Sequence, residues 1–210
     1  MPAYGGGAVA ESVRAVGAHP VIVDIDPLSY CLDPAAAAAA VTDRTAAVAA
    51  VHLFGHSADT ARLGQLTGRH GLKIVEFGAR PEEGTLEAVR RRRHAAYLNS
   101  RLTGVIVPRA LDGASHTYSE YVVRVPGNGR PDRDAFKHAL RARGVRCWVP
   151  VKIPVHWMPE FRAAIRRPEA ERAADQCLAL AVDASLSQRE LQRMVSACNS
   201  LGGLLLEPAC

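Results

Sequence analysis

The sequence predicts an α/β protein in which a mostly parallel sheet with helices is followed by a small α+β domain. Apolar strand patterns alternate with helical patterns through residues 1–80, and this order gives right-handed crossovers and parallel strands. Residues 81–210 begin with a long helical pattern and continue as strand, strand, helix, strand, which is typical of a small antiparallel sheet. We therefore expect two domains, 1–80 and 81–210, divided between Gly78 and Thr85.

The helices of the first part are predicted from apolar spacing and capping residues. Apolar residues at helical spacing predict a helix over residues 8–16, ended by a glycine. Asp33 followed by Pro34 and six alanines predicts a second helix, because Asp is a favoured N-cap and Pro is tolerated in the first turn. Asp59 is the expected N-cap of a third helix that runs to residue 69.

Three strands are expected between these helices. They cover residues 20–24, residues 46–52 and the centre of the stretch 71–80. The third strand contains Ile74 and Val75, which predict a buried parallel strand, and it carries Glu76 at its carboxyl end. Open α/β sheets bind ligands outside the carboxyl ends of their strands, so we place the site there.

The second part is expected to open with one long basic helix over residues 81–101, with Leu86, Val89, Ala96 and Leu102 on its inner face. A half-exposed strand is predicted from the alternating pattern in residues 116–125. The remaining expected elements are strands at 104–108 and 145–149, a helix from Asp132 or Asp134 to Gly144, and helices at 168–180 and 186–201.

Composition limits the class of protein. No apolar run approaches the about 18 residues that a membrane span needs, and the N-terminus MPAYGGG has no basic segment followed by an apolar one. The five cysteines form no CxxC pair, which favours reduced thiols over disulfides or a zinc site. We therefore expect a cytoplasmic protein with no membrane partner and no bound metal.

The positive charge does not predict a nucleic-acid partner. The formal net charge is +5, and only three of the 26 basic residues are lysines. The run Arg90–Arg93 has no aromatic residues interleaved for base stacking. We interpret it as the solvated face of a helix and expect no nucleic acid as partner.

Several motifs in order along the chain resemble the DegT/StrS-type sugar aminotransferases, which are pyridoxal-phosphate enzymes of deoxysugar and antibiotic pathways. The motifs that carry this resemblance are PAY at residues 2–4, GAHPVIVDID at 17–26, VHLFG at 51–55, HGLKIVE at 70–76, PVH at 154–156 and AER at 170–172. The resemblance implies an aminotransferase-like parallel sheet and a secondary-metabolite substrate, that is, a small biosynthetic intermediate.

The chain departs from the family pattern at the positions that would hold the cofactor. Gly6 stands where a ring-stacking aromatic is expected, Phe77 where an Asp holds the pyridine nitrogen, and Arg80 where a Gln is expected. Pro150–Lys152 replaces a His-Tyr-Pro motif, the central block with the Schiff-base lysine is skipped, and the phosphate-seating Gly-Thr pair would precede Met1. We therefore expect a trimmed scaffold that has lost pyridoxal phosphate and uses no cofactor.

One hypothesis is a small enzyme that performs cofactor-free acid/base chemistry, such as isomerisation, cyclisation or elimination. A histidine paired with a carboxylate can move a proton, and an arginine can stabilise a developing anion. The candidate catalytic residues are Glu76, His52, Arg80 and His56, and the candidate substrate-binding residues are Tyr4, Phe77, His156, Trp157 and Lys152. Each has a structural alternative: His52 as a core histidine, Glu76 as a packing residue, Lys152 as a solvated loop lysine.

The alternative hypothesis is a non-catalytic subunit that pairs with itself or with a full-length aminotransferase. Missing blocks would expose sheet edges and apolar surface that a partner must cover. A homodimer is expected under both hypotheses. Residual pyridoxal-phosphate-dependent transamination is the least favoured alternative, because no partner can restore a lysine to this chain.

Overall fold

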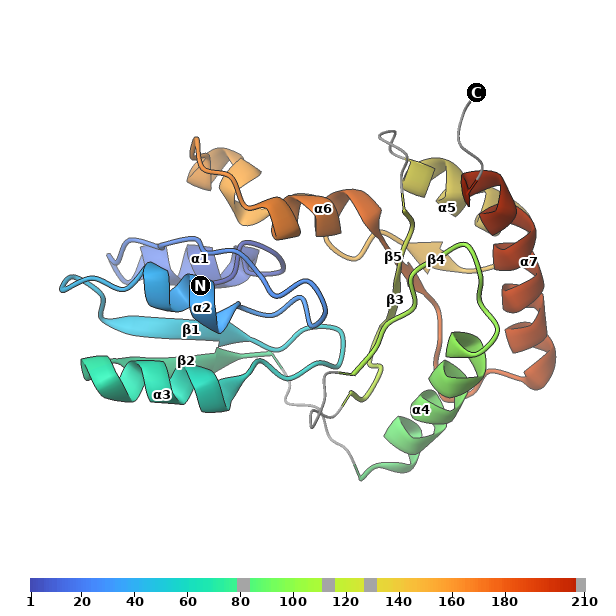
Figure 1. Cartoon of the computed structure of the whole chain (residues 1–210), viewed down its shortest axis with the longest axis horizontal. Helices are drawn as coiled ribbons and strands as arrows, with labels where there is room; N and C mark the ends of the chain where they lie inside the picture. The colour runs from blue at the N-terminus through green and yellow to red at the C-terminus, as the bar shows by residue number, and fades with distance from the viewer. Residues whose placement is uncertain (79–83, 111–115, 127–131, 207–210) are drawn as a thin grey trace. The chain divides into compact units, whose positions relative to one another are not determined.

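The computed structural model describes residues 1–78, 84–110, 116–126 and 132–206 (Figure 1). Contacts between residues divide the chain into two compact units. The first comprises Met1–Pro81, Ala110–Ser115 and Val151–Ala174, and the second comprises Glu82–Arg109, His116–Pro150 and Asp175–Cys210. The chain therefore returns to the first unit after residue 150.

The first unit contains a parallel pair of strands. Strand β1 (Ala47–Val51) pairs with β2 (Lys73–Phe77) in a register that places Ala47 opposite Lys73 and Val51 opposite Phe77. Their connection is α3 (Thr60–His70), which packs against both strands and begins where the Asp59 carboxylate accepts the Arg62 N–H at 2.9 Å. This βαβ crossover brings the carboxyl ends of both strands to one edge.

Two further helices belong to this unit. Helix α1 (Gly7–Ala15) follows the N-terminal glycines, and α2 (Pro34–Ala39) is capped by Asp33, whose carboxylate accepts two backbone N–H groups of its first turn. A core beside β1 and β2 joins these strands to α2 and α3. Its buried residues are Val23, Cys31, Leu32, Ala37, Val48, Ala50, Ala58 and Leu63.

The second unit is built on an antiparallel sheet with the order β3–β5–β4. Its strands are β3 (Tyr121–Arg124), β4 (Cys147–Trp148) and β5 (Cys177–Leu180). The helices of this unit are α4 (Leu86–Asn99), α5 (Asp132–Ala142) and α7 (Gln188–Leu206). The chain enters this unit for the last time along α6 (Pro168–Gln176), which leads directly into β5.

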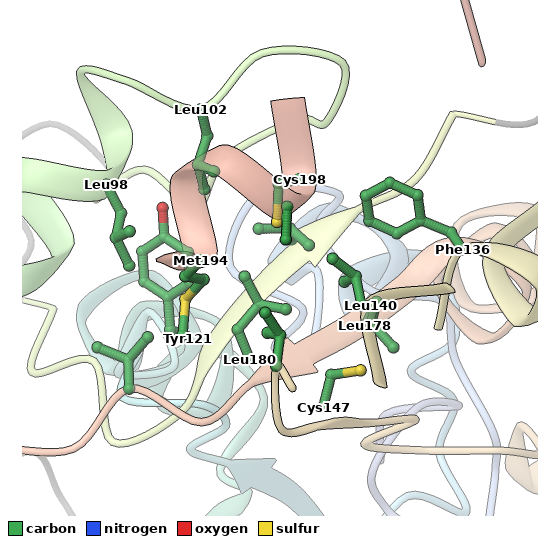
Figure 2. Close-up of a cluster of buried hydrophobic side chains, with 14 of the residues drawn as sticks. Leu98, Leu102, Tyr121, Phe136, Leu140, Cys147, Leu178, Leu180, Met194 and Cys198 are labelled. Atoms are coloured by element: carbon green, nitrogen blue, oxygen red, sulfur yellow. The ribbon is translucent and has the colours of Figure 1, made fainter. Parts of the chain in front are cut away.

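The core of the second unit lies on one face of this sheet (Figure 2). Tyr121, Leu178 and Leu180 point from the strands toward Phe136 of α5 and Met194 of α7. The hydroxyl of Tyr121 donates to Asn99 Oδ1 at 2.6 Å, so this buried polar group is satisfied. The predicted antiparallel sheet of the C-terminal part is confirmed.

Several predicted strands differ from the structure. Residues 20–24 and 104–108 do not form strands; single bridges link Val23 to Pro2 and Ile106 to Arg124. Strand β2 is where it was expected, but it is not buried: Val75 is 43% exposed, and β1 is the one described strand that pairs with it. Strand β3, predicted to be half-exposed, has three of its four residues buried.

Two helix predictions were also wrong in part. Helix α4 buries Ala88, Ala95 and Leu98, whereas Leu86 and Val89 of the expected inner face are exposed. The predicted helix 168–180 ends at Gln176, and residues 177–180 form the central strand β5, buried along its whole length. Two short 3₁₀ helices, Val155–Trp157 and Pro159–Phe161, were not predicted.

The contacts divide the chain differently from the predicted domains. Residues Ala110–Ser115 and Val151–Ala174, expected in the C-terminal domain, belong to the first compact unit. The division into a large-domain remnant and a small C-terminal domain remains a prediction. Among the described residues, no helix combines the length and apolarity that crossing a membrane requires.

Candidate active site

The carboxyl edge of the β1–β2 pair holds a buried imidazole against a carboxylate. Nε2 of His52 lies 2.9 Å from Oε2 of Glu76, and the two side chains are 2% and 27% exposed. Nδ1 of His52 accepts the Ala58 N–H at 3.1 Å. Because Nδ1 accepts a hydrogen bond, the single N–H proton of the neutral imidazole is on Nε2. His52 therefore donates from Nε2 to the Glu76 carboxylate.

The backbone places these two side chains together. Phe77, the last residue of β2, accepts a hydrogen bond from the His52 N–H at 2.9 Å, which continues the parallel ladder by one step. Gly78 follows with a φ of +84°, and a Cβ at this position would lie 2.8 Å from the carbonyl oxygen of His52. A glycine is therefore needed for the chain to turn away directly after Glu76 and Phe77.

His56 and Tyr4, two other predicted site residues, lie inside the first unit. Both are buried, and their rings flank an aromatic cluster in which Tyr30 contacts Tyr4, Phe54 and His56 at centroid distances of 6.2, 5.6 and 6.4 Å. Burial lowers the pKa of His56 from 6.5 to about 4 against the opposing effect of Asp26. His56 is therefore a neutral core histidine at pH 7, and a catalytic role for it stays a prediction.

His156 is fully buried and lies 3.2 Å from Glu171 of α6. Glu171 also accepts the Arg167 N–H at 2.9 Å, and this bond, followed by the contact with His156, lowers the pKa of its carboxyl. The contact between His156 and Glu171 ties the 3₁₀ segment to the start of α6 and so braces it. Trp157 and Lys152 are exposed near this segment, so they remain accessible to a ligand.

The remaining predicted residues are placed as follows. Phe77 is half-buried at the end of β2, and Arg80 lies outside the described residues.

Within the described ranges, no cluster of three His, Cys, Asp or Glu side chains has metal-binding geometry. The Ala58 N–H, which fixes the orientation of His52, could not be predicted, because a backbone donor carries no sequence signal. Glu171 was not predicted as a partner of His156, although it stands at the start of a predicted helix.

The comparison with known families identifies the class of protein. The model of the DegT/DnrJ/EryC1/StrS aminotransferase family matches residues 1–80 and 85–199. The chain therefore belongs to this family, and the resemblance inferred from its motifs is confirmed. The match runs through β1, β2 and Glu76 and resumes directly before α4.

Two curated proteins are similar to this chain in sequence. The pleiotropic regulatory protein of Geobacillus stearothermophilus is 25% identical over 279 positions, which include 90% of this chain and 74% of that protein. This alignment is longer than the 210-residue chain, so the relative carries internal residues that the chain lacks. The L-glutamine:scyllo-inosose aminotransferase of Streptomyces griseus is 48% identical over 69 residues, which cover 33% of this chain and 16% of that enzyme.

A solved structure of the same fold bears on the cofactor. NtdA from Bacillus subtilis, described with bound cofactor PMP, superposes with a TM-score of 0.83 at 20% identity, covering 97% of this chain and 67% of that one. The aminotransferase-like α/β fold is thus confirmed. The prediction that the chain uses no cofactor is wrong: its family is one of aminotransferases, and its structural neighbours include this cofactor-bound form.

Proposed function

We propose that this chain takes part in the amination of a cyclic keto-polyol or keto-sugar in an antibiotic-type pathway. The family match and the identity with the scyllo-inosose aminotransferase support this substrate class. The observation that carries the proposal is the Glu76 carboxylate, which His52 holds at 2.9 Å at the carboxyl edge of β1 and β2. Parallel sheets bind their ligands at this edge.

Glu76 fits one requirement of a pyridoxal-type cofactor. The ring of such a cofactor acts as an electron sink when a carboxylate faces its nitrogen. We assign this contact to Glu76, since residue 77, where the family places an Asp, is Phe77. His52 orients the carboxylate by donating from Nε2, and the Ala58 N–H prevents the imidazole from rotating. His52 is therefore a positioning residue in this proposal.

None of the three lysines stands at the carboxyl end of β1 or β2. Lys73 is exposed at the opposite end of β2, Lys137 on α5 is paired with Asp134 at 2.7 Å, and Lys152 is exposed before the first 3₁₀ helix. The chain has no further lysine. We therefore propose that the cofactor is held without a covalent bond, in its amine form, pyridoxamine phosphate.

The same contacts argue against His52 and His56 as a proton-transfer pair without a cofactor. Nδ1 of His52 is occupied by the Ala58 N–H, and His56 is buried with a pKa of about 4. Among the predicted catalytic residues that lie in the described part of the chain, Glu76 is the one that is both ionisable and accessible to solvent. In this proposal Glu76 is the residue that would supply the negative charge facing the ring of a bound cofactor.

Equilibrium dialysis of the purified chain with pyridoxamine phosphate tests this assignment. We expect saturable binding that weakens about tenfold in Glu76→Gln, because a neutral amide removes one charge-assisted contact. Glu160→Gln is the matched control, since Glu160 is an exposed glutamate of the same unit, and it should bind like the wild type. Absence of binding, or equal binding by Glu76→Gln, would contradict the role of Glu76.

Pyridoxal phosphate followed by borohydride reduction tests the non-covalent part. We expect no labelled peptide after mass analysis. A stoichiometric adduct on Lys152 or Lys73 would show that attachment is covalent and would contradict the assignment of the amine form.

A second candidate function is that of a partner subunit, and the exposure of β2 favours it. The Lys73 N–H donates to the Ala46 carbonyl, and the His52 N–H donates to the Phe77 carbonyl. In this register the backbone N–H and C=O groups of residues 73, 75 and 77 point toward β1. Ile74 therefore directs its backbone groups away from β1, toward the exposed edge. We propose that a second copy or a full-length aminotransferase covers this edge. Light scattering of the chain alone should give a homodimer, and a monomer that also fails to bind a co-expressed aminotransferase would contradict the proposal.

A further inference from the structure

An open groove lies at the edge of the sheet in the second unit, and every residue that lines it belongs to that unit. Its volume is about 520 Å³, and its lining includes Arg141, Gly144, Arg146 and Trp148. This volume is within the range of small-molecule sites, about 300–1,000 Å³. None of the residues assigned to the cofactor edge takes part, so the groove is a separate feature.

Trp148 supplies a flat aromatic wall. Side chains alternate along β4: Cys147 belongs to the core cluster (Figure 2), whereas Trp148 points to the other face and is 39% exposed. The indole hydrogen-bonds the Glu120 side chain, whose pKa is raised by burial against the opposing effect of this bond. The exposed part of the indole is available for stacking.

Arginines supply positive charge at the same place. Arg141 donates from Nε and Nη2 to the Cys147 carbonyl oxygen at 3.0 and 2.6 Å, which holds its guanidinium beside the edge of β4. The Arg146 side chain is 74% exposed, and its Nη2 lies 3.5 Å from Oδ2 of Asp183. Arg193 approaches Gly144, with Nη1 3.8 Å from the position of a Cβ there. Two guanidinium groups, of Arg141 and Arg146, therefore line the groove, and a third lies near Gly144. The Asp183 and Glu120 carboxylates contact Arg146 and Trp148 at the same place.

We propose that this groove binds a planar aromatic ligand that carries a phosphate or carboxylate. Its ring stacks on Trp148, and its anionic group is bound by Arg146 and Arg141, since aromatic stacking and a guanidinium–anion contact are complementary to these two ligand parts. The proposal does not depend on the function proposed above, because the groove and the Glu76 edge share no residue.

Trp148 fluorescence measures binding directly. The chain has two tryptophans, so the titrations use the Trp157→Phe background. We expect saturable quenching by uridine 5′-monophosphate or by 4-hydroxybenzoate, with a dissociation constant of about 1 mM or tighter. Uridine and inorganic phosphate, each lacking one half of the ligand, should bind at least about tenfold more weakly. The stronger of the two anionic probes identifies the source of the acid group.

Arg146→Gln should weaken binding of the preferred probe about tenfold and leave the melting temperature unchanged. Arg143→Gln is the matched control, because Arg143 is exposed on the preceding turn, bonds the Ala139 carbonyl and does not line the groove. No saturable quenching by either probe, or equal affinity in Arg146→Gln, would overturn the proposal. Equal affinity for inorganic phosphate would also overturn it, since the aromatic ring would then contribute nothing.

Discussion

His52 and Glu76, 24 residues apart, meet at 2.9 Å across the ends of two parallel strands, and the imidazole is oriented by the N–H of Ala58. The neutral imidazole carries one N–H proton, on Nε2, and donates it in a hydrogen bond to the Glu76 carboxylate. The position of the Glu76 charge is therefore set by a side chain that is 2% exposed. A substitution at His52 should therefore change both the stability of this edge of the sheet and the position of the carboxylate proposed to contact the cofactor.

Replacement of His52 by Leu should lower the free energy of unfolding by about 2 kcal/mol. The change leaves the buried Ala58 N–H without an acceptor, and such a loss costs about 1–3 kcal/mol. Urea unfolding followed by circular dichroism measures the difference. Glu76→Gln serves as the control, because the amide oxygen still accepts from His52, and its cost should stay below about 1 kcal/mol. Equal effects of the two variants would contradict the orientation assigned to His52.

The buried His56 should make the protein less stable in mild acid. Its pKa in the folded chain is about 4 against an ordinary value of 6.5, so the unfolded chain binds the proton more readily. Stability from the neutral ring is complete above pH 6.5 and is lost as the pH falls toward 4. At pH 5 the loss should be about 2 kcal/mol, at 1.36 kcal/mol per pH unit.

The variant His56→Phe tests this pH dependence, because phenylalanine retains an aromatic ring beside Tyr30 and cannot take up a proton. The melting temperature of the variant should change less than that of the wild type between pH 7 and pH 5. Parallel curves for the two proteins would mean that other groups cause the acid sensitivity.

Asp24 should stabilise the start of α6. Its carboxylate accepts the Glu169 N–H at 3.1 Å and the Ala170 N–H at 2.9 Å, so a residue distant in sequence performs the role of an N-cap. Asp24→Ala should cost about 1–2 kcal/mol, measured by urea unfolding. Asp33→Ala is a suitable comparison, since Asp33 caps the short helix α2 from its own N-cap position. No loss in Asp24→Ala would contradict the capping role.

The sequence predicted the parallel half of the fold well because its signals are local. Asp33 and Asp59 are N-caps as expected, and the alternation of strand and helix gave the β1–α3–β2 crossover. The exposure of Val75 could not be predicted in this way, because burial of a strand depends on which other strands are present. An apolar pair such as Ile74 and Val75 has the same pattern in a central strand and in an edge strand.

The candidate site was predicted in part. The convergence of His52 and Glu76 followed from the parallel sheet, since both stand at carboxyl ends of strands. The expectation of cofactor loss was wrong because it treated each departure from the family pattern as a lost contact. Glu76, one position before the expected Asp, places a carboxylate at that edge, and we propose it as the contact to the cofactor.

Strand β5 gives the last test, because its residues were expected to end a helix. Leu178 is fully buried at the centre of the sheet, whereas Leu86, expected on the inner face of α4, is 66% exposed. Leu178→Ala should therefore cost about 2–5 kcal/mol through lost burial and a cavity, and Leu86→Ala should stay within about 0.5 kcal/mol. Both changes remove the same side-chain atoms, and the expected difference in the free energy of unfolding exceeds the difference of about 1 kcal/mol in strand and helix propensity, so it reports burial. Similar losses at both positions would contradict the assignment of residues 177–180 to the central strand and of Leu86 to the surface.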